Sequence, residues 1–337
     1  MKKYRIGIVG ATGAVGQEII SLLEKREFPV AEARLLASPK SAGRQIQACG
    51  NLETVQETTA DSFKDLDLAI FSAGSKQSQQ FAEASRRHGC VVIDNSSAFR
   101  MDPTVPLIVP EINPDILEDH QGIIANPNCS TIQMLVALKP IMDAAGLSRI
   151  NVATYQAVSG AGKSGIEELA GQSAKLLNAQ DVEPEVFGKQ IAFNAVPHID
   201  DFQDNGFTKE EMKMIWETHK IFENDGVQVS PTCVRIPAFY GHSEAVYVET
   251  KSQIDADAVR VLLSGAPGIK VIDTRERGGY PTAVTDASGE DPVFVGRIRN
   301  DIMNPLGLHL WIVSDNIRKG AALNSLQIAE ALLERPE

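Results

Sequence analysis

A short apolar strand and a glycine-rich turn open the chain, which reads Tyr4-Arg5-Ile6-Gly7-Ile8-Val9-Gly10-Ala11-Thr12-Gly13-Ala14-Val15-Gly16. Apolar residues then recur at helical spacing over residues 13–25. Glycines at such a junction let the backbone approach a pyrophosphate, and the start of the helix supplies N–H donors. The G-x-x-G-x-x-G spacing differs slightly from G-x-G-x-x-G, and a structural glycine turn is the alternative. The strand–turn–helix context favours dinucleotide binding.

The first third of the chain continues to alternate between strand-like and helical segments. Short apolar runs bounded by turn residues are typical of buried parallel strands, and they lie at residues 33–37, 68–71, 91–93 and 123–125. A helical segment at 75–88 separates two of them. The alternation predicts an α/β fold with a Rossmann-like, doubly wound parallel sheet.

The character of the sequence changes after Cys129. Longer strand-like segments follow at residues 151–158, 227–236, 244–250, 293–299 and 308–313. Polar and apolar residues alternate over Glu244–Glu249, which predicts a mixed, mainly antiparallel sheet that has one polar face. A final Ala- and Leu-rich helix, at about 319–333, is expected to return to the first domain.

Composition narrows the class of protein. The chain has 337 residues, enough for two domains, and a formal net charge of −12, which argues against a nucleic-acid partner. We find no segment of membrane-spanning length and no signal peptide. The four cysteines are scattered without a C-x-x-C pair: Cys49, Cys90, Cys129 and Cys233. We therefore expect a soluble cytoplasmic protein with reduced thiols and no metal site.

The segment after the predicted second strand reads Ser38-Pro39-Lys40-Ser41-Ala42-Gly43-Arg44. Sites that prefer NAD usually carry an Asp or Glu here to bind the ribose 2′-hydroxyl. This segment has no carboxylate, and the hydroxyls of Ser38 and Ser41 with the cations Lys40 and Arg44 suit a 2′-phosphate. We predict NADP(H) as the cofactor, with a plain solvated loop as the alternative.

A cysteine lies in a tight polar turn that reads Asn126-Pro127-Asn128-Cys129-Ser130-Thr131, directly before an apolar helical run. The positive end of the helix dipole favours the thiolate form of such a cysteine. A thiolate attacks a carbonyl carbon and leaves again, so Cys129 is a candidate nucleophile. The alternative is a buried structural cysteine.

Three other groups of residues carry candidate chemistry. Gln156 ends a strand before a small-residue turn and could orient a substrate carbonyl, although a structural turn has the same pattern. His242 follows Arg235 by seven residues, which suggests a base beside an anion-binding fork, while a lone histidine is more often structural. Glu210 and Lys213 share a helix face at i, i+3, where a solvated salt bridge is the simpler interpretation.

Over essentially its whole length the chain resembles the aspartate-β-semialdehyde dehydrogenases of the bacterial kind. The most specific motifs are the glycine-rich turn and the cysteine turn already quoted, together with Arg235-Ile236-Pro237 leading to Gly241-His242-Ser243. Two other segments are similar to the family: Asp94-Asn95-Ser96-Ser97-Ala98-Phe99-Arg100 and Asp315-Asn316-Ile317-Arg318-Lys319-Gly320-Ala321-Ala322.

The resemblance implies a role for each candidate residue. Cys129 would be the acyl-forming nucleophile, His242 the acid/base, and Gln156 would position the intermediate. Substrate would be held by Arg235 and Glu210 at its carboxylate and amino groups, and by Arg100, Asn128 and Lys213 at its phosphate. Nucleotide contacts would come from Gly10, Thr12, Gly13, Ala14, Val15, Lys40, Ser41, Ser159, Gly160 and Asn316.

The resemblance also implies an architecture and a reaction. An NADP-binding Rossmann domain would comprise residues 1–127 and 316–337, and an α+β catalytic and dimerisation domain residues 128–315. The family works as a homodimer or homotetramer. It reduces aspartyl phosphate with NADPH to aspartate semialdehyde through a cysteine thioester, for lysine, threonine, methionine and diaminopimelate biosynthesis.

Two other functions compete with this one. A reductase of N-acetyl-γ-glutamyl phosphate shares the thioester chemistry, but its substrate offers no ammonium group to Glu210. A non-catalytic NADP-binding sensor would not need Cys129, Arg235 and His242 together. Dimer or tetramer, the strength of the NADP preference, regulation and the role of residues 171–187 stay open.

Overall fold

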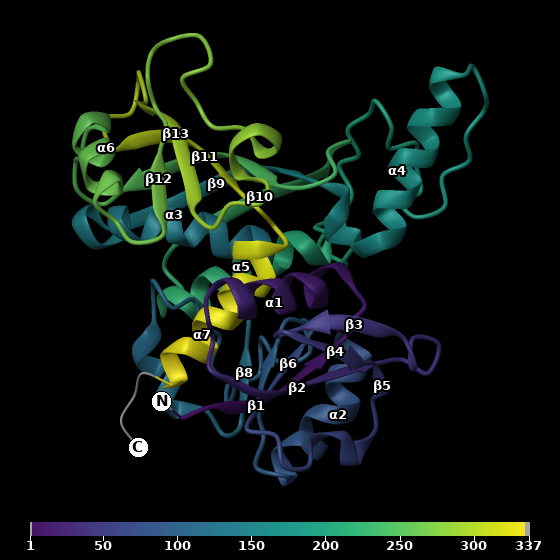
Figure 1. Cartoon of the computed structure of the whole chain (residues 1–337). Helices are drawn as coiled ribbons and strands as arrows, with labels where there is room; N and C mark the ends of the chain where they lie inside the picture. Colours follow the sequence, from purple (N-terminus) through teal and green to yellow (C-terminus); the bar gives the residue numbers. More distant parts are fainter. Residues whose placement is uncertain (1, 334–337) are drawn as a thin grey trace. The chain divides into compact units, whose positions relative to one another are not determined.

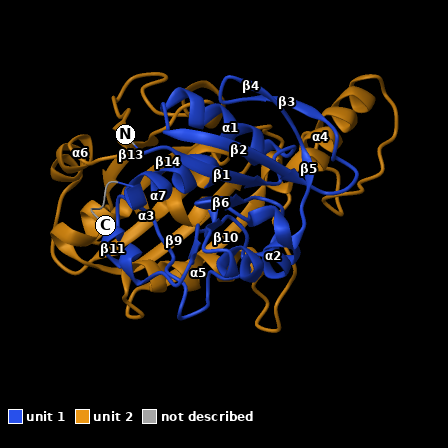
Figure 2. Cartoon of the chain, turned by 60° about the horizontal axis from the view of Figure 1, so that its bottom comes forward, with its two compact units in different colours: residues 1–128, 321–337 blue, residues 129–320 orange. Residues whose placement is uncertain are grey.

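The computed structural model describes residues 2–333 and divides the chain into two compact units (Figures 1 and 2). Unit 1 covers residues 1–128 and 321–337, and unit 2 covers residues 129–320. The division predicted from the sequence places these two boundaries after residue 127 and after residue 315. Residues 334–337 of the expected first domain lie outside the described residues.

Unit 1 is built on a six-stranded sheet in the order β5-β2-β1-β6-β7-β8, in which every pairing is parallel. Its strands are β1 (Tyr4–Val9), β2 (Val30–Ala37), β5 (Gln56–Glu57), β6 (Leu68–Phe71), β7 (Val91–Asp94) and β8 (Ile123–Ala125). A separate hairpin pairs β3 (Gln45–Ala48) with β4 (Asn51–Thr54). The strand order runs outward in both directions from β1, so the predicted doubly wound sheet is confirmed.

Helices cover both faces of this sheet. Alternate side chains of a strand point to opposite faces. Ile6 and Ile8 of β1 belong to one buried cluster, with residues of α1 (Ala14–Lys25) and α7 (Leu323–Leu333). Val9 belongs to a second cluster, with α2 (Ser75–Arg87) and the short helix η1 (Ala60–Phe63). A further short helix, η2 (Pro114–Asp119), precedes β8. The C-terminal helix therefore packs in unit 1, as predicted.

The C-terminal helix differs from the expectation at its start. A π-helical turn, η5 (Arg318–Ala322), precedes α7 in place of a regular helix from residue 319. Its Gly320 N–H donates to the Asp315 carbonyl oxygen, five residues earlier, at 3.2 Å. The Asp315 carboxylate meanwhile accepts the N–H groups of Ile317 and Arg318 and so caps the start of this turn. Such π turns occur often at functional sites.

Unit 2 is built on a six-stranded sheet in the order β10-β9-β11-β14-β13-β12. The strands are β9 (Leu147–Gln156), β10 (Gln228–Arg235), β11 (His242–Thr250), β12 (Ile269–Val271), β13 (Val293–Asn300) and β14 (Gly307–Ser314). The two outer pairs are parallel and the three inner pairs antiparallel. The sheet is mixed, as predicted.

One face of this sheet is covered by α3 (Cys129–Ala145), α5 (Lys209–Phe222) and α6 (Ala256–Ser264). The short helix η3 (Val158–Ala161) leads into α4 (Gly162–Leu177), and a π turn, η4 (Ala283–Ala287), packs near β13 and β14. The prediction of a polar strand face is wrong at Glu244. It lies on the buried face with Val246 and Val248, because a period of two places these three side chains together.

Candidate active site

Cys129 is the first residue of α3, the most deeply buried helix of unit 2. Its thiol is half-buried and forms no disulfide. A helix start leaves backbone N–H groups and the positive end of the dipole at this position. Gly320 lies against it: a Cβ on Gly320 would come within 2.5 Å of the Cys129 Cβ. The loop that carries Asn316 therefore closes onto the cysteine only because residue 320 has no side chain.

Three strand ends bring the other predicted catalytic groups to one edge of the unit 2 sheet. Gln156 and Arg235 end the parallel strands β9 and β10 and are register partners. His242 begins β11, which runs antiparallel to β9. All three side chains are at least nine-tenths buried. The strand register thus places an amide, a guanidinium and an imidazole at the same edge.

The tautomer of His242 is set by the backbone. Its Nδ1 accepts the Ala157 N–H at 3.1 Å, so the proton of the neutral ring is on Nε2. Nε2 is buried and makes no hydrogen bond within residues 2–333. Burial, and then the positive charge of Arg235, lower the pKa of His242 to about 3, against an opposing effect of Glu210. The ring is a neutral Nε2–H donor near pH 7.

Arg235 presents one edge of its guanidinium. NH1 donates to the Ala157 carbonyl oxygen at 2.7 Å, whereas Nε is buried without a hydrogen bond among the described residues. A Cβ on Gly160 would lie 2.7 Å from NH1 and 3.5 Å from the His242 Nε2, so a glycine is needed where this turn passes both groups. Burial lowers the pKa of Arg235, and the charges of Glu210 and Cys129 oppose it. The guanidinium and the cysteine thus interact electrostatically.

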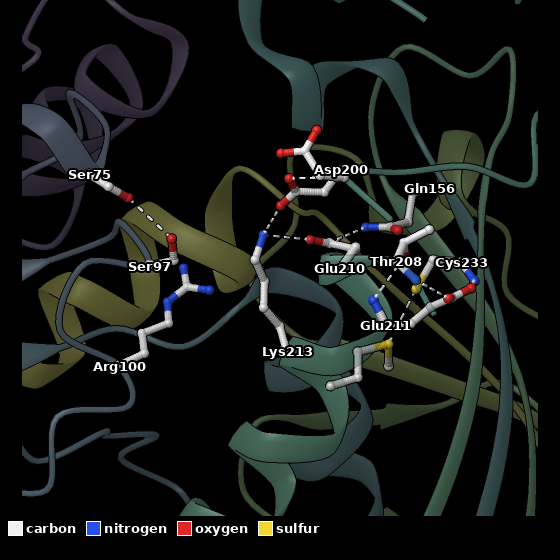
Figure 3. A network of polar contacts seen from close by, with 12 residues as sticks. Ser75, Ser97, Arg100, Gln156, Asp200, Thr208, Glu210, Glu211, Lys213 and Cys233 are labelled. Atoms are coloured by element: carbon white, nitrogen blue, oxygen red, sulfur yellow. Dashed lines mark hydrogen bonds and ion pairs between the residues drawn. The ribbon is translucent and has the colours of Figure 1, made fainter. Parts of the chain in front are cut away.

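A buried network extends from Gln156 through Glu210 to Lys213 (Figure 3). The Gln156 amide donates to Glu210 at 3.1 Å, and Lys213 donates to Glu210 at 3.0 Å and to Asp200 at 2.7 Å. Burial lowers the pKa of Lys213, but Glu210 and Asp200 outweigh it, so the net shift is upward. The predicted i, i+3 pair forms, but it is not solvated: the two side chains are only 7% and 16% exposed.

The first turn of α5 is fixed by a capping box. Thr208 accepts the Glu211 N–H, and a Glu211 oxygen accepts the Thr208 N–H at 2.8 Å. The other Glu211 oxygen accepts the Cys233 N–H of β10 at 3.0 Å (Figure 3). These bonds hold the helix start against β10 and set Glu210 beside Gln156.

Asn316 connects three turns of unit 2. Its Oδ1 accepts the Gly241 N–H at 2.9 Å, and its amide contacts the Ser159 hydroxyl at 3.0 Å. Ser159, Gly160 and Asn316, which the resemblance places at the nucleotide, thus lie in one cluster beside the turn that leads to His242. Asp200 and Gly320 belong to the arrangement but are not among the predicted site residues. Gly320 stands in a quoted motif, while nothing in the local sequence marks Asp200.

In unit 1 the glycine-rich turn forms a backbone cradle. A Cβ on Gly10, whose φ is +88°, would lie 2.8 Å from the Ser72 carbonyl oxygen, and one on Gly16 would lie 2.3 Å from that of Gly10. Gly13 is the N-cap of α1 and provides no side-chain cap. The helix start therefore offers its N–H groups to an outside acceptor, which fits the phosphates of a dinucleotide.

The other predicted site residues of unit 1 lie in the loops that follow its strands. The Thr12 Oγ1 donates to the Ser41 Oγ at 3.4 Å, so the glycine-rich turn contacts the 38–44 segment. Lys40 and Arg44 of this segment are exposed. Arg100 is buried and donates to the backbone carbonyls of Asn126 at 2.9 Å and Asn95 at 2.8 Å. Figure 3 also shows the contact between Ser75 and Ser97. The two bonds of Arg100 to backbone carbonyls fix the orientation of its guanidinium within unit 1.

Three further observations concern disulfides, metal sites and membrane-spanning helices. None of the four cysteines forms a disulfide. Among residues 2–333, no group of three or more His, Cys, Asp or Glu is arranged to hold a metal ion. No helix in the same described range is both long enough and apolar enough to span a membrane.

Unit 1 has a parallel sheet with a glycine-rich turn that suits a dinucleotide. Unit 2 has a cysteine at a helix start and buried polar side chains at one sheet edge. Together these features define a two-domain dehydrogenase. Two family models match: "Semialdehyde dehydrogenase, NAD binding domain" over residues 5–120, and "Semialdehyde dehydrogenase, dimerisation domain" over residues 138–319. Aspartate-semialdehyde dehydrogenase 2 of Vibrio cholerae is 54% identical over 335 residues, 98% of either chain. The Bacillus subtilis enzyme is 50% identical, over 97% of this chain and 96% of its own. The chain belongs to the aspartate-semialdehyde dehydrogenase family.

Solved structures agree with this assignment. Aspartate semialdehyde dehydrogenase II of Vibrio cholerae, complexed with ASA, has a TM-score of 0.98 and 52% identity over the full length of both chains. The Candida albicans enzyme with NADP has a TM-score of 0.74 and 26% identity, over 98% of this chain and 99% of its own. The protein is an oxidoreductase with a nicotinamide-binding domain.

Proposed function

We propose that the protein interconverts L-aspartyl 4-phosphate and L-aspartate 4-semialdehyde with NADP(H), through a thioester on Cys129. The observation that carries this proposal is the set of Gln156, Arg235 and His242 at one sheet edge, with Glu210 hydrogen-bonded to Gln156. This set offers a fork for a carboxylate, an acceptor for an ammonium group and a donor for a carbonyl oxygen. Relatives named for this aldehyde support the choice of substrate.

Each catalytic group has a defined task in the biosynthetic direction. The Cys129 thiolate attacks the acyl carbon and phosphate leaves, which forms the thioester. Bound NADPH supplies the hydride that reduces this carbonyl. The oxyanion accepts the Nε2 proton of a His242 imidazolium, and the aldehyde forms when that proton returns to Nε2 and the C–S bond breaks to restore the thiolate. The Gln156 amide, held by Glu210, orients the acyl oxygen.

His242 needs a higher proton affinity for this task than it has in the protein without substrate. The positive charge of Arg235 is one cause of its low pKa. A substrate carboxylate bound to Arg235 neutralises that charge, so binding raises the pKa of His242. We infer that substrate binding lets His242 take a second proton from solvent at Nδ1, which replaces its hydrogen bond from the Ala157 N–H and activates the acid/base.

Substrate groups are assigned by charge. The Nε edge of Arg235 binds the α-carboxylate, and Glu210 binds the α-ammonium group. Lys213, Arg100 and Asn128 bind the phosphate. Lys213 already pairs with two carboxylates, so an ammonium group that engages Glu210 would release part of its charge for the phosphate.

We assign NADP(H) as the particular nicotinamide cofactor. The cradle at Gly10, Gly13 and Gly16 suits the pyrophosphate. Ser38, Lys40, Ser41 and Arg44 suit the 2′-phosphate, and Ala14 and Val15 begin the helix that supplies N–H donors. Ser159, Gly160 and Asn316 would contact the nicotinamide end. We assign nucleotide binding to unit 1, catalysis to unit 2, and a cytoplasmic location to the protein, where reduced thiols persist.

The open face of the unit 2 sheet suits a second copy of the chain. The match to a dimerisation domain covers this unit. Tyr155, Ala245, Tyr247 and Trp311 are only half-buried on the face opposite α3. Part of this face forms a hollow lined by residues of β9, β10, β11 and β14. We assign this surface to a homodimer; a tetramer would need a further surface.

The decisive experiment is reduction of NADP⁺ by the purified protein with L-aspartate 4-semialdehyde, with and without inorganic phosphate. We expect reduced nicotinamide only when phosphate is present, and none from Cys129→Ser. Turnover without phosphate would indicate a hydrolytic aldehyde dehydrogenase. Preference for N-acetylglutamate 5-semialdehyde would contradict the assignment, and no turnover with either aldehyde would favour a non-catalytic nucleotide sensor.

A further inference from the structure

An aromatic ring outside the predicted site lies over Arg235. The guanidinium carbon is 5.9 Å from the centroid of the Phe187 ring, within the range of a cation–π contact. We propose that Phe187 is a positioning residue, which sets the plane of Arg235 and through it the affinity for the substrate carboxylate. This inference rests on the proposed role of Arg235. It also gives a function to part of the segment that follows α4.

Packing fixes the position of Phe187. Its side chain joins a buried cluster that includes Val158 and Leu169. Gly165 of α4 leaves the necessary room, because a Cβ there would lie only 3.0 Å from the tip of the ring. The ring is therefore confined between α4 and Arg235.

Backbone hydrogen bonds hold the segment on both sides of the ring. Before it, the Glu168 carboxylate of α4 accepts the N–H groups of Glu185 and Val186. After it, Gln172 accepts the N–H groups of Ile191, at 2.9 Å, and Ala192, at 3.1 Å. One helix thus anchors both ends of the segment, so Phe187 is presented by a fixed turn.

Arg235 needs such a restraint. Its bond from NH1 to the Ala157 carbonyl oxygen fixes one corner of the guanidinium, but one bond does not define the plane. The neighbouring Phe187 ring restricts that freedom by contact, and the buried Nε, which has no hydrogen bond among residues 2–333, is then held in the orientation that a carboxylate must share. Loss of the ring would leave the charge in place and the fork misaligned.

The variant Phe187→Leu tests this proposal, because it keeps apolar bulk and removes the ring. A partly desolvated cation–π contact predicts a rise of about 5- to 30-fold in KM for L-aspartate 4-semialdehyde. We expect kcat to change less than about 2-fold, and KM for NADP⁺ and phosphate to stay unchanged. Site-specific 3,5-difluorophenylalanine at position 187, which keeps the shape and weakens the ring quadrupole, should give an intermediate KM.

Two controls separate positioning from general packing. Leu176→Ala removes bulk from the same cluster without removing a ring from Arg235, and its KM should stay near that of the unmodified protein. With 3-aminopropanal, which lacks the carboxylate, Phe187→Leu should show an unchanged kcat/KM. An unchanged semialdehyde KM in Phe187→Leu, or an equal rise in Leu176→Ala, would overturn the proposal.

A readout without turnover separates this proposal from the proposed function. The Arg235 Hε resonance should show a ring-current shift that disappears in Phe187→Leu, and titration with L-aspartate should move it with a Kd that the variant weakens. If the unmodified protein fails to oxidise the semialdehyde but these signals behave as expected, the reaction is wrong and the positioning role holds. If the resonance shows no ring current, the positioning role is wrong.

Discussion

Burial decides the protonation of the polar groups on the covered face of the unit 2 sheet. His242 is fully buried beside a cation, and its pKa is lowered to about 3. Glu244, two residues further along β11, is fully buried, and burial raises its pKa well above the usual range. His242 is therefore neutral near pH 7, burial favours the protonated form of Glu244, and Arg235 carries the positive charge at this edge.

The tautomer and charge of His242 are directly measurable. We expect ¹⁵N imidazole spectra to show a neutral, Nε2-protonated ring at pH 5, because Nδ1 accepts a backbone N–H and the pKa is about 3. His242→Gln identifies the signal by its loss. Titration of this ring near pH 6.5, the value of an ordinary histidine, would contradict the burial argument.

Arg235→Lys should affect activity far more than stability. A lysine keeps one positive charge but cannot bind a carboxylate with two parallel N–H groups. Loss of one charge-assisted hydrogen bond, about 1.5–3 kcal/mol, corresponds to a roughly 10- to 150-fold fall in kcat/KM for the semialdehyde. Steady-state kinetics and thermal unfolding of the same preparations give the comparison. Proportional losses of activity and stability would show that Arg235 is mainly structural.

Glu244→Gln should remove a pH-dependent loss of stability. The folded protein keeps the Glu244 proton to a higher pH than the unfolded chain, so stability falls as pH rises above the unfolded value near 4.3. Glutamine has nearly the same shape and cannot ionise. We expect similar stability of the two proteins at pH 4 and a more stable variant at pH 8. Urea unfolding at pH 4 and pH 8 measures this difference in stability. Parallel pH profiles of the two proteins would contradict the prediction.

At the scale of elements, the loop that ends in η5 depends on Gly320. Gly320→Ala would place a Cβ 2.5 Å from that of Cys129, so either the loop or the start of α3 must move. We expect at least about a 10-fold loss of kcat, because small displacements of a nucleophile are costly.

Gly171→Ala is the matched control. This glycine lies inside α4, and its added Cβ would meet nothing within 4 Å. Alanine favours a helix interior by roughly 0.5–1 kcal/mol over glycine, so this variant should be slightly more stable and fully active. Normal activity in Gly320→Ala would show that the loop adapts without disturbing Cys129.

At the scale of the whole molecule, the homodimer surface gives a prediction in solution. Ala245 is half-buried at the centre of the open face, where its register partners are Ala153 and Trp311. A charge there would be buried without a partner in the dimer, so Ala245→Arg should yield monomers by light scattering. Val261→Arg places the same charge on exposed α6 and should leave the mass unchanged. An intact dimer with Ala245→Arg would place the interface elsewhere.

Local patterns predicted most of the fold. The strands over residues 4–9 and 68–71 match β1 and β6, because short apolar runs between turn residues are characteristic of buried parallel strands. The prediction failed where tertiary contacts compete with local preference. Glu244 fits a polar strand face by pattern, yet the strand register buries it, and the π turn η5 stands where a regular start of the C-terminal helix was expected.

The sequence by itself determined the doubly wound and mixed sheets, the return of the C-terminal helix and the chemical types at the site. These follow from periodicity, glycine spacing and residue identity, which are local properties. Only the tertiary structure decided which groups meet and in what state: the charge of His242, the partners of Lys213, and the ring of Phe187 against Arg235. These contacts join residues distant in sequence, and burial and strand register, rather than any local pattern, set their protonation and geometry.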